Sequence, residues 1–294
     1  MLAERGYLPA GSRAHGVRLV AVADPDERRC ATLAAGLPRY PGAAELLAAE
    51  EVDGLVLATP VAAHLADAVL AAAAGLVSLV EKPPAADGVE TAALAALDPL
   101  PSIGFNLRFD RDLQRLRAAV PPGTRVHLAL DLHNEADSWR SYVVADDALL
   151  RLGPHLVDLV RWLTGSELEQ VRATELTHDS AVLELEAGRT TARISLATNR
   201  PPVNRVEIRG ADGTPIGRAA PGLVRRVIRR VTEGDSLVRR LALQLEAFAG
   251  AARGEPQPLL ATAHDGAAVM AAIDAARRSG GAWIPVAPLV AGVG

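Results

Sequence analysis

The first hundred residues alternate short apolar runs with segments of helical pattern, and this alternation restricts the possible folds more than any other feature. The apolar runs are Val17–Ala23, Val52–Ala58, Leu76–Val80 and Pro101–Phe105. Helical patterns lie near residues 27–35, 43–50, 61–74 and 88–97. Continuous apolar runs suit strands buried on both faces of a parallel sheet, and helices suit the crossovers between them. The pattern predicts an α/β fold for residues 1–105, as a Rossmann-like, doubly wound parallel sheet.

The pattern changes after residue 105. We expect a helix near 110–119, strands near 124–132, 169–176, 180–188, 191–197 and 203–209, and closing helices near 236–253 and 264–278. The strands alternate with period two, and Gly188 and Gly213 lie in turn-like segments between them. This predicts a second α/β domain over residues 106–294, with a mostly antiparallel sheet that binds substrate. The open face of that sheet would need a cover, which predicts a homo-oligomer, and the last helices could pack back on the first domain.

Composition excludes several classes of protein. The 31 basic and 35 acidic residues are interspersed and give a net charge of −4, so we expect no nucleic-acid partner. The longest apolar stretch contains Asp53, His64 and Asp67 and is interrupted by Pro60 and Gly75, so we expect no membrane span. A single cysteine and a charged N-terminal segment favour a cytoplasmic location.

A lysine follows one of the predicted strands directly, in the sequence Leu-Val-Glu-Lys-Pro-Pro of residues 79–84. Open α/β sheets bind ligands at the carboxyl ends of their strands, and two prolines prevent a helix there, so Lys82 should face a crevice. The preceding strand ends at Thr59-Pro60, and a helical segment with His64 follows it. This order of strand, Thr-Pro turn, His-bearing helix, strand and Glu-Lys-Pro resembles the glucose-fructose oxidoreductase / inositol dehydrogenase (Gfo/Idh/MocA) family of nicotinamide-dependent oxidoreductases.

The resemblance implies a nicotinamide cofactor bound by Asp24, Thr59, Pro60, Glu81 and Lys82. Asp24 ends the second strand, where the family's acidic residue accepts hydrogen bonds from ribose hydroxyls and disfavours a 2′-phosphate, so NAD is expected rather than NADP. Asp24 also suits the start of the following helix, and the two roles are compatible.

For catalysis, the resemblance assigns Lys82 to hydrogen-bond the substrate oxygen. The alternative for Lys82 is a solvated lysine in a loop. His64 is expected to pack within its helix rather than to take part in catalysis. Val61 stands where the family usually has asparagine.

A second segment, Ala148–Trp162, resembles the family's substrate-domain helix. It implies that His155 takes the alcohol proton, whereas the alternative is a histidine at a helix N-terminus bonded to the backbone. Asp158 would pack or orient. Arg151 stands where family dehydrogenases commonly have an aspartate; it would pair with Asp147 or bind an anionic substrate group. We assign substrate contacts to Asn106, Arg140, Arg151 and His155, with Trp139 beside Arg140, and we expect no metal.

The glycine-rich turn of the family has no counterpart in this chain. Met1–Ala10 resembles the helix that follows the turn, with Ala3 as its third small residue, so the first strand of the sheet is missing. One hypothesis is a start codon assigned too far downstream, with codons before Met1 encoding an apolar strand that ends in Gly-x-Gly. The other is a genuine loss, for which we expect poor cofactor affinity or no cofactor. We favour the first hypothesis, because Val17–Asp24 has the sequence pattern of a strand in a complete sheet.

These features predict an NAD-dependent oxidoreductase acting on a secondary alcohol or ketone of a sugar, cyclitol or related small polar metabolite. Two alternatives use the same scaffold. One is a non-redox lyase or epimerase, and the other is a catalytically silent subunit that assembles with a partner.

Overall fold

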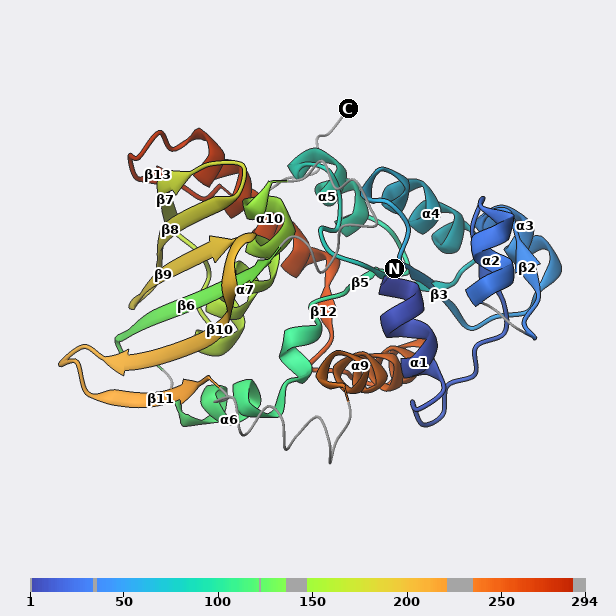
Figure 1. Ribbon diagram of the computed structural model, residues 1–294, viewed down its shortest axis with the longest axis horizontal. Coiled ribbons are helices and arrows are strands. Elements are labelled where there is room, and N and C mark those ends of the chain that lie inside the picture. Colours follow the sequence, from blue (N-terminus) through green and yellow to red (C-terminus); the bar gives the residue numbers. More distant parts are fainter. Residues whose placement is uncertain (1, 34–35, 122, 136–146, 221–234, 288–294) are drawn as a thin grey trace. The chain divides into compact units, whose positions relative to one another are not determined.

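The computed structural model describes residues 2–33, 36–121, 123–135, 147–220 and 235–287. The chain divides into two compact units, whose secondary structure is drawn in Figure 1. Unit 1 contains Met1–Ala86, Glu90–Phe109 and Val224–Ala263, and unit 2 contains Asp87–Val89, Asp110–Leu223 and His264–Gly294. Each unit is described by itself below.

Four strands form the main sheet of unit 1, in the order β12-β5-β4-β3. They are β3 (Gly54–Leu57), β4 (Val77–Val80), β5 (Ser102–Ile103) and β12 (Ala261–Thr262). β3, β4 and β5 are parallel, and β12 is antiparallel to β5. Helix α4 (Val61–Ala73) packs on β3 and β4. The carboxyl ends of the parallel strands therefore meet at one edge of the sheet, which is where this class of sheet binds ligands.

A separate two-stranded sheet contains β1 (Val22–Ala23) and β2 (Arg39–Tyr40), which are parallel. Helix α2 (Glu27–Leu33) connects them, and α3 (Ala43–Ala49) packs on both. The predicted strand over Val17–Ala23 was too long: only its last two residues form a strand, and none of the seven is fully buried. A strand buried on both faces and both edges needs two neighbours, and β1 pairs only with β2 among the described strands.

The N-terminal helix and a late helix share one hydrophobic core with β4. The first consists of a π-helical segment, η1 (Ala3–Tyr7), and α1 (Leu8–Gly11). The second is α9 (Ser236–Ala252), which Asp235 caps by accepting the Leu237 N–H. α9 packs on η1, α1, β4 and the 3₁₀ helix η2 (Asn106–Phe109). Tyr7, Leu79, Phe109, Leu241 and Phe248 belong to this core, which places Tyr7 beside β4.

Unit 2 contains a seven-stranded sheet in the order β11-β10-β6-β9-β8-β7-β13. The strands are β6 (Val126–Glu135), β7 (Gln170–Leu176), β8 (Ser180–Ala187), β9 (Thr190–Ala197), β10 (Asn199–Gly210), β11 (Pro215–Ala219) and β13 (Ile284–Pro285). β6 and β9 are parallel, and every other neighbouring pair is antiparallel. The expected mostly antiparallel sheet is therefore confirmed.

Helix α7 (Ala148–Thr164) covers one face of this sheet by packing on β6, β8 and β9 (Figure 1). Helix α10 (Ala263–Arg278) lies close to α7, because a Cβ atom on Gly153 would come within 2.9 Å of Ile273. Helix α6 (Arg111–Ala119) packs on β11 and α7. Helix α5 (Gly88–Ala95) completes the described elements.

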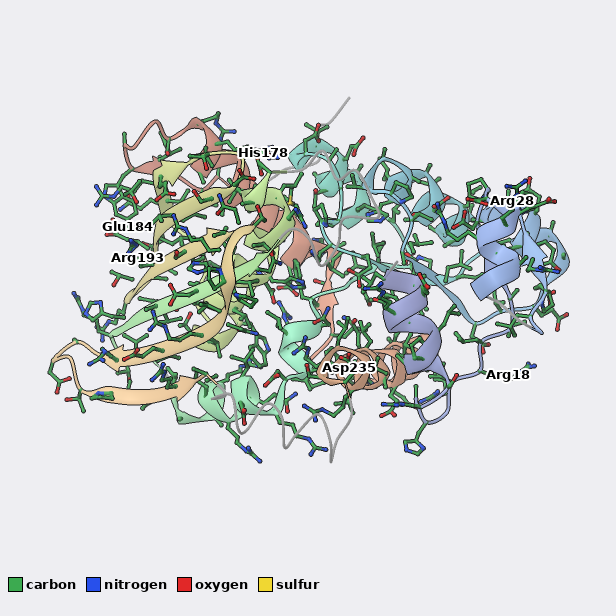
Figure 2. The ribbon with its side chains drawn as sticks, in the orientation of Figure 1. Arg18, Arg28, His178, Glu184, Arg193 and Asp235 are labelled. Carbon is green, nitrogen blue, oxygen red and sulfur yellow. The ribbon has the colours of Figure 1, made fainter. Side chains whose placement is uncertain are left out.

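The other face of the sheet carries paired charges. Arg172, Glu184 and Arg193 lie opposite one another on β7, β8 and β9, and Figure 2 shows the last two side by side. Arg172 donates to Glu184, and Arg205 on β10 donates to Asp131 on β6 at 2.7 Å. Period-two alternation thus gives one apolar and one polar face, and oligomerisation through the polar face stays a prediction.

Candidate functional site

Lys82 lies on a turn directly after β4 in unit 1. It is the only lysine among the 31 basic residues of the chain, and every other one is an arginine. The Glu81 N–H donates to the Leu57 carbonyl at 3.0 Å, which attaches the start of the turn to β3. Lys82 is half-buried, the next two prolines are buried, and the Lys82–Pro83 peptide bond is cis. Lys82 thus follows a strand at the carboxyl edge of the parallel sheet, as its sequence position predicts.

The carboxylate beside Lys82 is buried. The Tyr7 hydroxyl donates to Glu81 Oε1 at 2.5 Å, and the Lys82 N–H donates to Glu81 Oε2 at 3.0 Å. Burial raises the pKa of the Glu81 carboxyl, while the Tyr7 hydrogen bond and the Lys82 charge oppose the rise. The Glu81 carboxylate thus accepts hydrogen bonds from Tyr7 and from the turn itself, and the cofactor contact that the resemblance implied for Glu81 stays a prediction. Tyr7 was not a sequence candidate, because a single tyrosine in the N-terminal helix gives no local sign of its partner.

His64 connects the two turns that the sequence singled out. Its ring lies on α4 and is almost fully buried. Nδ1 is 3.1 Å from the Pro83 carbonyl oxygen and 3.2 Å from that of Pro84, and Nε2 is 3.0 Å from that of Thr59. Burial lowers the pKa of His64, while these carbonyl groups oppose the shift. The expectation that His64 packs is met, and its two ring nitrogens face carbonyl oxygens of the Thr-Pro and Lys-Pro turns, to one of which a neutral ring donates.

The Thr59-Pro60 turn leads from β3 into α4. The Thr59 hydroxyl donates to Asp67 at 3.1 Å, and Pro60 stands just before the first residue of α4. Proline is favoured near a helix start, because its missing N–H would find no partner there in any case. Asp67 thus holds the Thr59 hydroxyl, and His64 faces the Thr59 carbonyl, so both contacts fix the same residue of the turn.

Asp24 follows β1 and leads into α2. One of its carboxylate oxygens accepts the Asp26 N–H at 2.9 Å, and the other pairs with Arg29 at 3.2 Å. Asp26 accepts the N–H groups of Arg28 and Arg29, so Asp26 rather than Asp24 caps the helix. The Asp24 side chain keeps 27% of its surface exposed, so a ribose role stays a prediction that the geometry allows.

In unit 2, His155 and Arg151 lie on α7. The helix begins at Ala148, so His155 is about two turns inside it, and the alternative of a helix N-terminal histidine is wrong. Asp158 is buried, in agreement with a packing or orienting role. Asp147 caps α7 by accepting the Leu150 N–H at 2.8 Å, and its second oxygen pairs with Arg277 at 2.9 Å. Arg151 and His155 are both partly exposed, one turn apart.

The remaining sequence candidates divide into two groups. Asn106 opens η2 in unit 1 and is buried, with its N–H donating to the Gly104 carbonyl at 2.9 Å. Trp139 and Arg140 lie outside the described residues, so their substrate contacts stay predictions.

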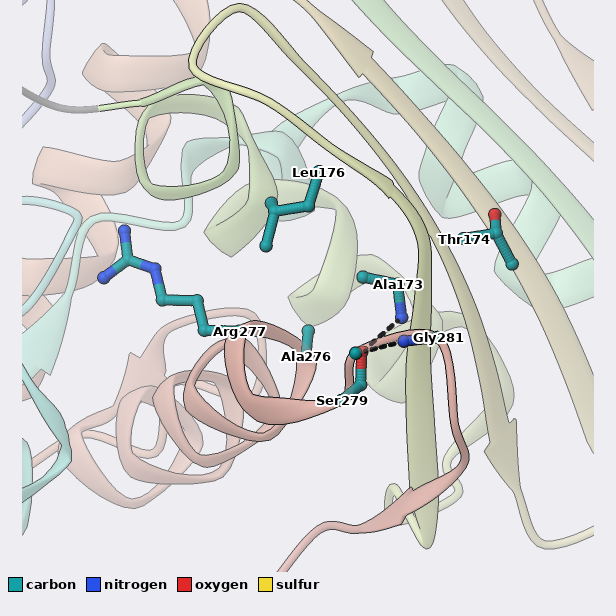
Figure 3. A pocket seen from close by; sticks show the side chains of 8 residues that line it. Ala173, Thr174, Leu176, Ala276, Arg277, Ser279 and Gly281 are labelled. Atoms are coloured by element: carbon teal, nitrogen blue, oxygen red, sulfur yellow. Dashed lines mark hydrogen bonds between the residues drawn. The ribbon is translucent and has the colours of Figure 1, made fainter.

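A shallow pocket in unit 2 contains none of these candidates. It is lined by parts of β7 and the end of α10, as Figure 3 shows. Its polar groups are already engaged: Ser279 accepts the Ala173 N–H at 3.0 Å, and Arg277 pairs with Asp147. The pocket therefore offers little recognition chemistry to a ligand.

The described part of the chain contains no group of three or more His, Cys, Asp or Glu side chains that could hold a metal ion. None of its helices is both long and apolar enough to cross a bilayer.

Comparison with known protein families gives matches in both halves of the chain. Residues 3–97 match the family model "Oxidoreductase family, NAD-binding Rossmann fold". Residues 123–215 match the model "GFO/IDH/MocA C-terminal domain".

Individual relatives agree with these matches. The rhizopine catabolism protein MocA of Rhizobium meliloti is 29% identical, over 92% of this chain and 89% of the relative. An inositol 2-dehydrogenase of Corynebacterium glutamicum is 28% identical, over 60% of this chain and 58% of the relative. The chain thus spans little more than half of that dehydrogenase. The crystal structure of myo-inositol 2-dehydrogenase from Lactobacillus plantarum has a TM-score of 0.79 at 17% identity and covers 98% of both chains, which shows a shared fold.

Proposed function

We propose that this chain, which belongs to the Gfo/Idh/MocA family of oxidoreductases, transfers a hydride between NAD and a secondary alcohol or ketone of a small polar metabolite. The substrate class is a sugar, cyclitol or related polyol. Lys82 carries the proposal: the only lysine of the chain stands at the carboxyl end of a parallel strand, on a turn held by buried polar groups. A lysine amine is a compact donor whose charge responds to its surroundings, unlike the arginine used everywhere else.

In the oxidation direction, Lys82 donates a hydrogen bond to the substrate oxygen and stabilises the negative charge that develops there. His155 accepts the hydroxyl proton as general base. The nicotinamide, when bound, supplies the acceptor for the hydride that leaves the carbon. In reduction His155 returns the proton to the same oxygen.

The residues of unit 1 fit a dinucleotide only in part. Asp24 offers a partly exposed carboxylate for ribose hydroxyls, and the turns at Thr59-Pro60 and Lys82 follow parallel strands. The sequence has no G-x-G-x-x-G turn to surround a pyrophosphate with backbone N–H groups. Because the Asp24 carboxylate would repel a 2′-phosphate, we expect NAD to be preferred over NADP.

The test is a substrate screen with the purified protein. Inositols, neutral sugars and sugar acids are offered with NAD or NADP, and the absorbance of the reduced nicotinamide is followed. We expect NAD reduction with at least one polyol, and its loss in Lys82→Met and in His155→Asn proteins that keep the wild-type circular dichroism. Activity of wild-type size in Lys82→Met would refute the proposed role of this lysine.

One observation favours a second candidate. Arg151 is partly exposed one turn before His155, and a guanidinium suits a carboxylate or phosphate on the substrate. A lyase or epimerase acting on an acidic substrate would show turnover without net formation of reduced nicotinamide. A silent partner subunit would bind neither cofactor nor substrate in calorimetry.

We also propose a homo-oligomer, formed through the polar face of the unit 2 sheet, and a cytoplasmic location. Arg172, Glu184 and Arg193 form a row of alternating charge across three strands. The same row on a second copy of the chain can pack against it so that an arginine of each copy faces the glutamate of the other. Light scattering at low and high salt tests this, because a charge-paired interface weakens as salt screens it.

A further inference from the structure

We infer that Tyr7 is a positioning residue for Lys82 and acts on it through Glu81. The inference rests on the proposed function only where it predicts activity. The link between the three residues can be measured on the protein without cofactor or substrate. It assigns a role to a tyrosine that precedes the turn by 74 positions in sequence.

The carboxylate of Glu81 joins the N-terminal helix to the turn. Its Oε1 accepts the hydroxyl hydrogen of Tyr7 on η1, and its Oε2 accepts the backbone N–H of Lys82. Tyr7 is only 5% exposed and Glu81 only 4%, so water does not compete for either bond. The orientation of the Lys82 peptide therefore depends on where Tyr7 holds the carboxylate.

Backbone packing leaves this carboxylate little freedom. A Cβ atom on Gly104 would lie 2.7 Å from Oε1 and 3.0 Å from Oε2 of Glu81. Glycine at the end of β5 thus allows the main chain to approach the carboxylate closely. Tyr7 on one oxygen, the Lys82 N–H on the other and the Gly104 main chain against both thus restrict the position of the carboxylate.

The ionisation of the Glu81 carboxyl depends on the Tyr7 hydroxyl. The titratable groups that act on Glu81 are Tyr7 from η1 and the adjacent Lys82. Burial raises the pKa of Glu81, and the hydrogen bond from Tyr7 opposes this by stabilising the ionised form. Burial and the nearby Glu81 charge hold the pKa of Tyr7 well above its usual value, so Tyr7 remains a donor. Loss of the Tyr7 hydroxyl should therefore raise the pKa of Glu81, so that its carboxylate becomes protonated at a higher pH. Protonation should weaken the hydrogen bond that Glu81 accepts from the Lys82 N–H.

The experiment uses the fact that the chain has one lysine. Protein grown with ¹³C-labelled lysine gives one set of side-chain signals, which belong to Lys82 and are followed against pH without ligand. We expect an inflection at acidic pH that disappears in Glu81→Gln. In Tyr7→Phe it should move upward by about one to two pH units, the size of one hydrogen bond to a charged group.

A matched control is available in the same unit. The Tyr40 hydroxyl donates to Glu50 at 2.6 Å, so Tyr40→Phe removes a comparable tyrosine–glutamate bond away from the turn. We expect this variant to leave the Lys82 inflection in place. An inflection at the same pH in wild type and Tyr7→Phe, or an equal move in Tyr40→Phe, would overturn the inference.

Kinetics then separates the inference from the proposed function. In the active enzyme, the acid limb of the kcat/KM profile should shift upward in Tyr7→Phe and not in Tyr40→Phe. A tyrosine with a purely structural role would lower the unfolding temperature and leave that limb in place, which would contradict positioning. If wild type turns over nothing while the Lys82 signal responds to Tyr7→Phe, the proposed function fails and the positioning of Lys82 stands.

Discussion

Removal of the His64 ring should loosen the two turns that it connects. In the wild type the ring nitrogens lie 3.0–3.2 Å from three carbonyl oxygens, those of Thr59, Pro83 and Pro84. His64→Ala deletes the donor and leaves a buried acceptor without a partner, which costs about 1–3 kcal/mol. The space left by the ring adds about 1–2 kcal/mol. We therefore expect the variant to lose about 2–5 kcal/mol of local stability.

The pH dependence of this loss has a definite sign. Because burial lowers the pKa of His64, the unfolded chain binds a proton there before the folded protein does. Stability from His64 is thus complete above about pH 6.5 and is lost as the pH falls toward the folded-state pKa. His64→Ala lacks this dependence. The difference in stability between wild type and variant should shrink on acidification.

The measurement is hydrogen exchange of peptides that cover β3, β4 and the turn after β4, corrected for intrinsic rates at each pH. It reports the opening free energy of these strands without requiring the two units to unfold together. His64→Gln is the matched variant, because its amide can still donate to one turn, and it should lose only about 1–2 kcal/mol. A variant difference that grows as the pH falls would show that the folded ring is charged, and this would refute the reasoning.

Three further predictions concern the chemistry. Lys82→Met should lower turnover by about 10²–10⁴-fold without changing the opening free energy of β4, and Lys82→Arg should not rescue it; rescue by arginine would mean that any positive charge suffices. Arg151→Asp should shift preference from acidic to neutral ligands in a paired competition assay, whereas an unchanged ratio would make Arg151 a surface residue. In calorimetry NAD should bind more tightly than NADP, and Asp24→Asn should reduce that difference; an equal preference in both proteins would exclude a ribose contact by Asp24.

Much of the fold could be predicted from local pattern. The parallel units were found because β3 and β4 are continuous apolar runs, and the second sheet because β8 and β9 alternate over part of their length. Strands of two residues, such as β2, β12 and β13, carry no periodicity and were missed. The parallel pairing of β6 with β9 joins segments separated by two other strands, which local pattern does not encode.

In the candidate site, too, residues with a local sequence signal could be predicted and residues that depend on distant contacts could not. Lys82 could be found because its signal is local: a strand, a lysine and two prolines in succession. Tyr7 could not, because its partner Glu81 lies 74 residues away and only the folded core brings η1 to β4. His64 was visible as a buried helix residue, but its bridging role depends on two turns that meet only in the fold.

A chain with one lysine has one internal position that amine chemistry can reach. Acylating reagents and reactive metabolites attack the ε-amine of Lys82 and the N-terminal amine, while the arginines of the surface do not react in this way. Acylation removes the positive charge and adds bulk on the half-buried turn after β4. Attachment of a dye or a solid support through lysine would therefore block the proposed site itself, so this protein should be labelled or immobilised through Cys substitutions elsewhere.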